Sequence, residues 1–200
     1  MLVFWEQRIA FLATPKTGST AIAAALESLA AVSIQRPPVL KHTTVHRYRR
    51  FIAPFLEAAS KGEFTVVALM RHPKDWLGSW YRFRQREDVG TANSTRGMSF
   101  DAFVQAWCRD PRPDFADVGS QARFLRPRLE GGVGRGVDRL FRYEEIETFV
   151  QFLEDRLGCE IILPRLNVSP PGETELSPGT EAMLAGFATE DFELYRTLAP

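Results

Sequence analysis

A short segment near the start of the chain, Arg8 to Leu26, reads RIAFLATPKTGSTAIAAAL. Its first part, Ile9–Ala13, is an apolar run of residues that suit a strand, and Thr14–Ser19 interrupts that run. The residues that follow, Thr20–Leu29, are rich in alanine and leucine, which favour helix. The segment therefore predicts a strand, a tight turn and a helix, in that order.

The predicted turn, PKTGST at residues 15–20, has the features of a phosphate-binding loop. A turn that opens a helix gathers unpaired backbone N–H groups at the positive end of the helix, where an anion binds. Gly18 lets the backbone approach a ligand closely, and Lys16 adds a full positive charge. Three further residues of the turn carry hydroxyl donors: Thr17, Ser19 and Thr20. The alternative is a polar turn that happens to hold a lysine.

The loop lacks the nucleotide-hydrolase pattern of glycine, four residues and then Gly-Lys-Ser/Thr, because Gly18 follows Lys16 and no glycine precedes it. PKTGST instead resembles the phosphosulfate loop of the sulfotransferases, which bind 3′-phosphoadenosine 5′-phosphosulfate (PAPS). The resemblance implies a P-loop-NTPase-like sulfotransferase fold. This is an α/β fold of three layers, α/β/α, with a central and mainly parallel sheet. It also implies that residues 16–20 bind the donor and that Lys16 is catalytic.

A second motif follows the apolar run FTVVALM at Phe64–Met70, which predicts a strand buried on both faces. Arg71 comes at the carboxyl end of this strand, where ligands bind open α/β sheets. Ser79 lies two turns along the next predicted helix, so both side chains are expected to reach one phosphate. The segment resembles the 3′-phosphate-binding motif of sulfotransferases, in which an arginine precedes a serine by eight positions.

Two of the chain's three histidines, His42 and His46, lie in the hexapeptide KHTTVH. A histidine near neutral pKa suits removal of a proton from an acceptor hydroxyl. In cytosolic sulfotransferases the base is a histidine between the two nucleotide motifs, which implies His42 as the base, with His46 as the second choice. The alternative is that both histidines are surface residues.

A third predicted strand, Val137–Tyr143, precedes a predicted helix at Glu144–Leu157. Tyr143 is followed by two acidic residues and then isoleucine, which resembles another recurring sulfotransferase segment. There the tyrosine helps to hold the adenine, so the resemblance implies a donor-binding role for Tyr143. The alternative is that Tyr143 packs at the sheet edge.

Length and composition set the broad class of the protein. Two hundred residues predict a single domain over 1–200, and a formal net charge of zero argues against a general nucleic-acid binder. The chain has no apolar run of the roughly 20 residues that cross a bilayer, and its apolar start is too short for a signal peptide. We therefore expect a cytoplasmic protein without a membrane partner. Cys108 and Cys159 have no metal-type spacing, and no metal site is predicted.

The predicted function is transfer of a sulfuryl group from PAPS to a hydroxyl or amine acceptor, leaving adenosine 3′,5′-bisphosphate (PAP). The expected acceptor is a small molecule or a carbohydrate. The carbohydrate-type and bacterial branches are nearer, because Ala21 stands where cytosolic members have a tryptophan beside the adenine. An ATP-dependent small-molecule kinase, a non-catalytic nucleotide- or phosphoanion-binding protein and a helix–sheet interaction protein are the alternatives. The identity of the acceptor and the oligomeric state stay open.

Overall fold

A computed structural model describes residues 1–126, 136–164 and 173–198 of the chain, and these form two structural units. Unit 1 contains the described residues of Met1–Arg71, Gln121–Leu166 and Leu198–Pro200. Unit 2 contains those of His72–Ser120 and Asn167–Thr197. The prediction of one domain over residues 1–200 stays a prediction.

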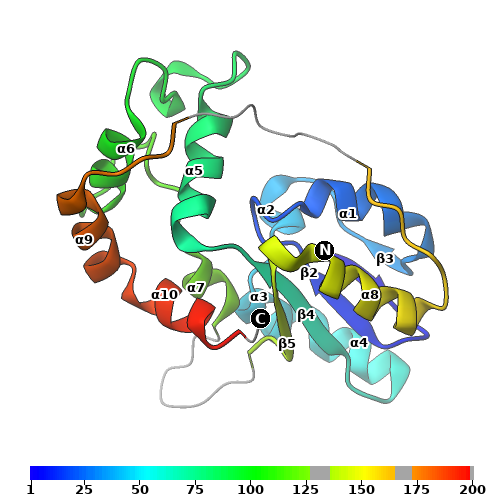
Figure 1. The fold of residues 1–200 in the computed structure, drawn as a ribbon. Coiled ribbons are helices and arrows are strands. Elements are labelled where there is room, and N and C mark those ends of the chain that lie inside the picture. The colour runs from blue at the N-terminus through cyan, green and yellow to red at the C-terminus, as the bar shows by residue number, and fades with distance from the viewer. Residues whose placement is uncertain (127–135, 165–172, 199–200) are drawn as a thin grey trace. The chain divides into compact units, whose positions relative to one another are not determined.

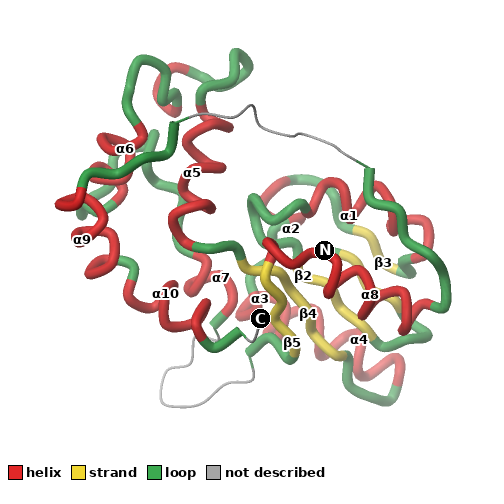
Figure 2. The backbone as a smooth tube through the Cα atoms, viewed as in Figure 1, coloured by secondary structure: helices red, strands yellow, loops and turns green. Residues whose placement is uncertain are grey.

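Unit 1 is built on a mixed five-stranded sheet with the strand order β3-β1-β2-β4-β5 (Figures 1 and 2). Three neighbouring strands, β2, β4 and β5, run parallel, with Leu12 level with Ala68 and Met70 level with Arg142. β1 runs antiparallel to both of its neighbours, β2 and β3. The strand bounds are β1 Leu2–Phe4, β2 Ile9–Leu12, β3 Val32–Ser33, β4 Thr65–Met70 and β5 Arg139–Arg142.

The α/β class and the parallel centre of the sheet are confirmed. The whole sheet is mixed, because β1 runs antiparallel to its neighbours, and neither β1 nor β3 was predicted. These strands have three and two residues, which is too short for a periodic pattern to reveal. A tight turn brings β1 against β2: the amide of Arg8 donates to the carbonyl of Trp5, and Arg8 adopts a φ of 52°.

Helices cover both faces of this sheet, which explains why its central strands are continuously apolar. On one face, α1 (Ser19–Leu26) and α8 (Ile146–Leu157) pack on the side chains that point toward them. The Phe11 and Phe149 rings lie 5.4 Å apart there. Figure 1 shows α3 (Val45–Arg47) and α4 (Ala53–Ser60) on the other side of the sheet from α8. The buried residues of this second layer are Val45, Tyr48, Ala53 and Leu56.

An ion pair at the amino ends of β4 and β5 fixes how these two strands align. Asp138 Oδ2 accepts from the Arg49 guanidinium at 2.9 Å and from the Val66 amide at 2.7 Å. The Asp138 amide in turn donates to the Val66 carbonyl at 2.8 Å. Arg49 belongs to the π-helical turn Tyr48–Ile52, which leads into α4. The aligned strands therefore end level with each other at the opposite edge, where Arg71 and Tyr143 follow.

Shorter helices complete unit 1, and unit 2 is helical. Unit 1 also contains α2 Pro38–Lys41, α7 Gln121–Leu125 and the 3₁₀ turns Glu27–Leu29 and Tyr143–Glu145. Unit 2 contains α5 Pro73–Arg84, α6 Phe100–Trp107, α9 Pro178–Phe187, α10 Thr189–Arg196 and the 3₁₀ turn Thr91–Asn93. Its core includes Trp76, Tyr81, Phe100, Phe103, Trp107 and Leu184. Within the described residues, every helix is too short or too polar to traverse a lipid bilayer.

Candidate functional site

The loop between β2 and α1 has the backbone of an anion cradle. Lys16 and Gly18 both adopt left-handed conformations, with φ of 65° and 71°. Thr17 is fully buried, and its hydroxyl donates to the Thr14 carbonyl at 3.0 Å, which closes the loop on itself. Alternation of left-handed and ordinary residues turns successive N–H groups toward one concavity, the geometry that binds anions in many phosphate sites.

The backbone amides at the start of α1 lack the carbonyl partners that later residues of a helix have. Outside the helix and strand ladders of the described residues, the amides from Gly18 to Thr20 donate no backbone hydrogen bond. α1 begins at Ser19, and Gly18 is its N-cap without a side-chain cap. The helix dipole therefore adds partial positive charge to the amides at the start of α1. Such a group of donors suits a phosphate or sulfate.

Lys41 brings a second cation to the start of α1. Its Nζ donates to Thr20 Oγ1 at 3.2 Å, and burial lowers the pKa of Lys41. Sequence reasoning missed Lys41 as a site residue. The signal that could have found it is a lysine beside the candidate base. Lys16, within the loop, and Lys41, bonded to Thr20, thus both bring positive charge to the cradle.

His42 lies against the start of the same loop. Its Nδ1 is 2.6 Å from the Ala13 carbonyl oxygen. A carbonyl only accepts, so Nδ1 carries the proton and Nε2 keeps a lone pair. Burial lowers the pKa of His42; the bond to Ala13 opposes this shift, and the positive charges of Lys41 and Lys16 add to it. His42 is therefore a neutral imidazole that can accept a proton at Nε2. The second candidate, His46, lies half-buried on α3.

The lowered pKa of His42 predicts how the free energy of unfolding changes with pH. The folded-state pKa lies below the ordinary value of 6.5, so the unfolded state binds the proton more tightly. The free energy of unfolding should therefore be independent of this group above pH 6.5 and fall as the pH drops below it. Urea denaturation from pH 8 to pH 5 measures this, with His42→Ala as the comparison. The idea fails if the wild type and His42→Ala lose stability equally over this range.

Arg71 and Tyr143 follow the carboxyl ends of β4 and β5, and they lie at the same sheet edge as the loop. Because Met70 is level with Arg142, the next residue of each strand is brought close. Arg71 Cζ lies 4.8 Å from the centroid of the Tyr143 ring, a cation–π contact. A Cβ added to Gly18 would lie 3.0 Å from Tyr143 Cε2. Tyr143 therefore contacts both the anion cradle and Arg71.

The Arg71 guanidinium has charge to offer an anion. It forms no ion pair with the described residues, and its Nε is buried without a hydrogen-bond partner. Its backbone is held by the fully buried side chain of Gln121, which the sequence analysis missed. No local pattern marks Gln121, because its partner lies 50 positions away.

The predicted site residues fall into two groups. Unit 1 brings together the loop residues, the candidate base and the two strand-end residues: Lys16, Thr17, Gly18, Ser19, Thr20, His42, Arg71 and Tyr143. Ser79 is a buried residue of α5 in unit 2. The predicted sharing of one phosphate between Arg71 and Ser79 stays a prediction.

Gly18→Ala should cost stability and disturb the cradle, because alanine at φ 71° is strained and its Cβ would press on Tyr143. We expect the free energy of unfolding to fall by about 1–2 kcal/mol, with weaker anion binding. Gly158→Ala is the matched control, since Gly158 has a φ of 69° and open space around its Cβ position. Denaturant unfolding and phosphate titration compare the two. Equal stability losses with unchanged anion affinity in Gly18→Ala would contradict the predicted contact.

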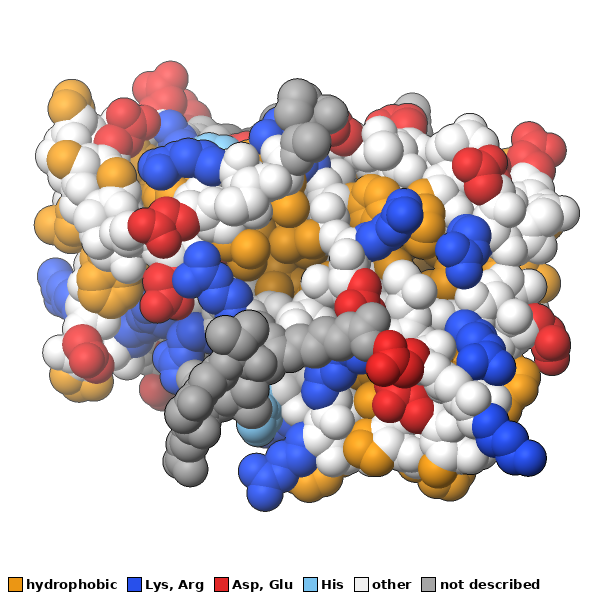
Figure 3. Space-filling model, turned by 90° about the horizontal axis from the view of Figure 1, so that it is seen from below, with side chains coloured by type: hydrophobic (Ala, Val, Ile, Leu, Met, Phe, Trp, Pro, Cys, Tyr) orange, Lys and Arg blue, Asp and Glu red, His pale blue; other side chains and the backbone are white. Residues whose placement is uncertain are grey.

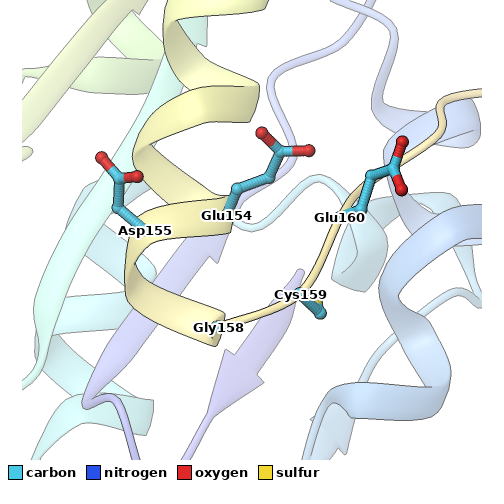
Figure 4. A pocket seen from close by; sticks show the side chains of 5 residues that line it. All are labelled: Glu154, Asp155, Gly158, Cys159 and Glu160. Carbon is cyan, nitrogen blue, oxygen red and sulfur yellow. The ribbon is translucent and has the colours of Figure 1, made fainter.

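An open hollow elsewhere on unit 1 has the wrong charge for an anion. It has a volume of about 370 Å³ and lies at the C-terminal end of α8 (Figure 4). That end lies about 18 Å along the helix from the end beside Tyr143. The carboxyl end of a helix also repels anions. The residues that line the hollow are Glu154, Asp155, Gly158, Cys159 and Glu160.

Acidic and basic side chains are mixed on the surface rather than separated into large patches of one charge on the face that Figure 3 displays. This agrees with a formal net charge of zero. Lys16, Lys41 and Arg71 are the cations that the contacts above place at or beside the loop and Tyr143.

Comparison with known proteins adds no assignment. No model of a protein family matches this chain, and no curated protein matches it. The function is therefore proposed from the geometry of unit 1 and from the two sequence motifs.

Proposed function

We propose that this chain is a PAPS-dependent sulfotransferase with the three-layer, P-loop-like fold of that class. The observation that carries the proposal is the convergence of an amide cradle, a neutral histidine and an unpaired arginine at one sheet edge. A phosphate-binding protein needs only the cradle. A transferase that deprotonates its acceptor also needs a base, and His42 lies against the first residue of the cradle.

The two anionic groups of PAPS match the two cationic regions of the site. The loop from Lys16 to Thr20 would bind the 5′-phosphosulfate through backbone amides and the lysine. Arg71 would bind the 3′-phosphate. Tyr143, which contacts both regions, is the candidate for the adenosine side.

The chemistry assigned to the chain is one in-line displacement. PAPS supplies an activated sulfuryl group. His42 Nε2 takes the proton from the acceptor hydroxyl or amine as its oxygen or nitrogen bonds to sulfur. The bond from sulfur to the bridging phosphate oxygen breaks, and its electron pair leaves with PAP. Lys16 stabilises the negative charge on that oxygen, and Lys41, bonded to Thr20, adds positive charge nearby.

Calorimetry with PAP and with ATP tests the donor assignment. We expect PAP to bind without magnesium and more tightly than ATP, and Arg71→Met to weaken PAP more than adenosine 5′-monophosphate. Magnesium-dependent ATP binding as the stronger interaction would favour a kinase. Binding of PAP without turnover of labelled PAPS on any hydroxyl or amine acceptor would favour a non-catalytic phosphoanion-binding protein. If neither nucleotide binds, the proposal is wrong.

A further inference from the structure

The side-chain amide of Gln121 makes two hydrogen bonds with the backbone of Arg71. Gln121 Nε2 donates to the Arg71 carbonyl at 2.7 Å, and the Arg71 amide donates to Gln121 Oε1 at 2.9 Å. Gln121 is fully buried at the start of α7. A carboxamide has the same donor and acceptor as a peptide group, so it can pair with a backbone as a strand would.

Arg71 needs such a partner because it lies one residue beyond the end of β4. The last paired residue is Met70, which is level with Arg142 on β5. The amide and carbonyl of Arg71 therefore lie past the strand ladder, and Gln121 satisfies both. Buried backbone groups without partners are costly, so the two bonds hold this peptide in one place.

The chain's path makes this restraint more important. It leaves unit 1 after Arg71 and returns to unit 1 at Gln121. Arg71 is thus the final residue of its unit before the crossing, with strand pairing on its N-terminal side alone. The hydrogen bonds of Gln121 fix the peptide from which the Arg71 side chain extends to the Tyr143 ring.

We propose that Gln121 is the positioning residue of the anion-binding arginine: it orients Arg71 toward the 3′-phosphate of the donor. This role rests on the proposed function and deepens it. Gln121 itself touches no ligand in this scheme. Its contribution is to keep the Arg71 guanidinium beside Tyr143 while leaving the charge of the arginine unpaired.

Gln121→Met tests the role, because methionine has a similar length but cannot form either bond. We expect PAP affinity to fall about tenfold, the effect of losing one buried hydrogen-bond partner. Affinity for adenosine 5′-monophosphate, which lacks the 3′-phosphate, should be unchanged. The matched control is Gln151→Met, at an exposed glutamine of α8, which should bind both nucleotides as the wild type does.

A double-mutant cycle separates positioning from a general structural role. In an Arg71→Met background, Gln121→Met should cause no further loss of PAP affinity, since the residue it orients is gone. A structural role alone predicts equal losses for both nucleotides and a second loss in the Arg71→Met background. Either of these results would overturn the inference.

Gln121→Glu supplies a readout that remains usable if Gln121→Met does not fold. A protonated carboxyl group can accept from the Arg71 amide and donate to its carbonyl, as glutamine does, whereas a carboxylate cannot donate. The ratio of wild-type to Gln121→Glu affinity for PAP should therefore be near one at low pH and rise with pH. A ratio that does not change with pH contradicts the role.

The outcomes also distinguish this inference from the proposed function. PAP binding that depends on Arg71 but not on Gln121 overturns the positioning role and leaves the proposed function in place. Failure of the wild type to bind PAP overturns both.

Discussion

The Lys16→Ala variant is expected to transfer sulfuryl groups at least about a hundredfold more slowly than the wild type, the typical cost of one preorganised donor to a developing anion. The other hydrogen-bond donors of the cradle are backbone amides, which carry no full charge. Lys16 carries the full charge that the departing phosphate oxygen needs. Turnover of labelled PAPS, measured as kcat at saturating donor, reports the loss.

The control for Lys16→Ala is Lys61→Ala. Lys61 also has a left-handed backbone, with a φ of 53°, and it lies in unit 1 at the end of α4. Both substitutions replace a lysine whose backbone is left-handed with alanine, so their effects on the free energy of unfolding should be alike. Only Lys16→Ala should lose turnover. Normal activity with PAPS in Lys16→Ala would show that the lysine has been assigned wrongly.

His42→Ala is expected to lose about a hundredfold to ten-thousandfold in rate, the range for one general base. Its affinity for PAP should stay close to that of the wild type, because Nε2 acts on the acceptor. Stopped-time assays of turnover, together with PAP titration, separate these two quantities. The same assay should show wild-type activity falling as the pH drops through the lowered pKa of His42, because only the neutral ring accepts a proton.

His46→Ala is the matched control for His42→Ala. It removes the same side chain four positions later, on α3. We expect it to retain turnover, since it is the His42 ring that lies 2.6 Å from the first residue of the loop. Loss of activity in His46→Ala but not in His42→Ala would transfer the role of base to His46.

Local patterns in the sequence were enough to predict the elements that carry the loop, Arg71 and Tyr143. Continuous apolar runs predicted β2 and β4, and the loop PKTGST was placed between a strand and a helix, as found. The strand and helix on either side of Tyr143 were also predicted. Each of these depends on neighbours within a few positions, which is the information that a single sequence holds.

Features that depend on distant contacts could not be predicted. β1 becomes a strand because Leu2–Phe4 pairs with both β2 and β3, not because of its own three residues. The tautomer of His42 is set by Ala13, which lies 29 positions away. Gln121 reads as an ordinary polar residue until the fold brings it to Arg71. In all three cases the deciding partner is far away in the chain.

The two outer strands of the sheet make poor templates for aggregation. One edge is β3, which has only two residues, and a strand of that length offers few backbone groups to an incoming chain. The other is β5, which carries Arg139 and Arg142 among its four residues. Charged side chains and short edges both discourage intermolecular strand addition. In the part of the chain that the structure describes, the apolar centre of the sheet is thus flanked by edges that are short or charged.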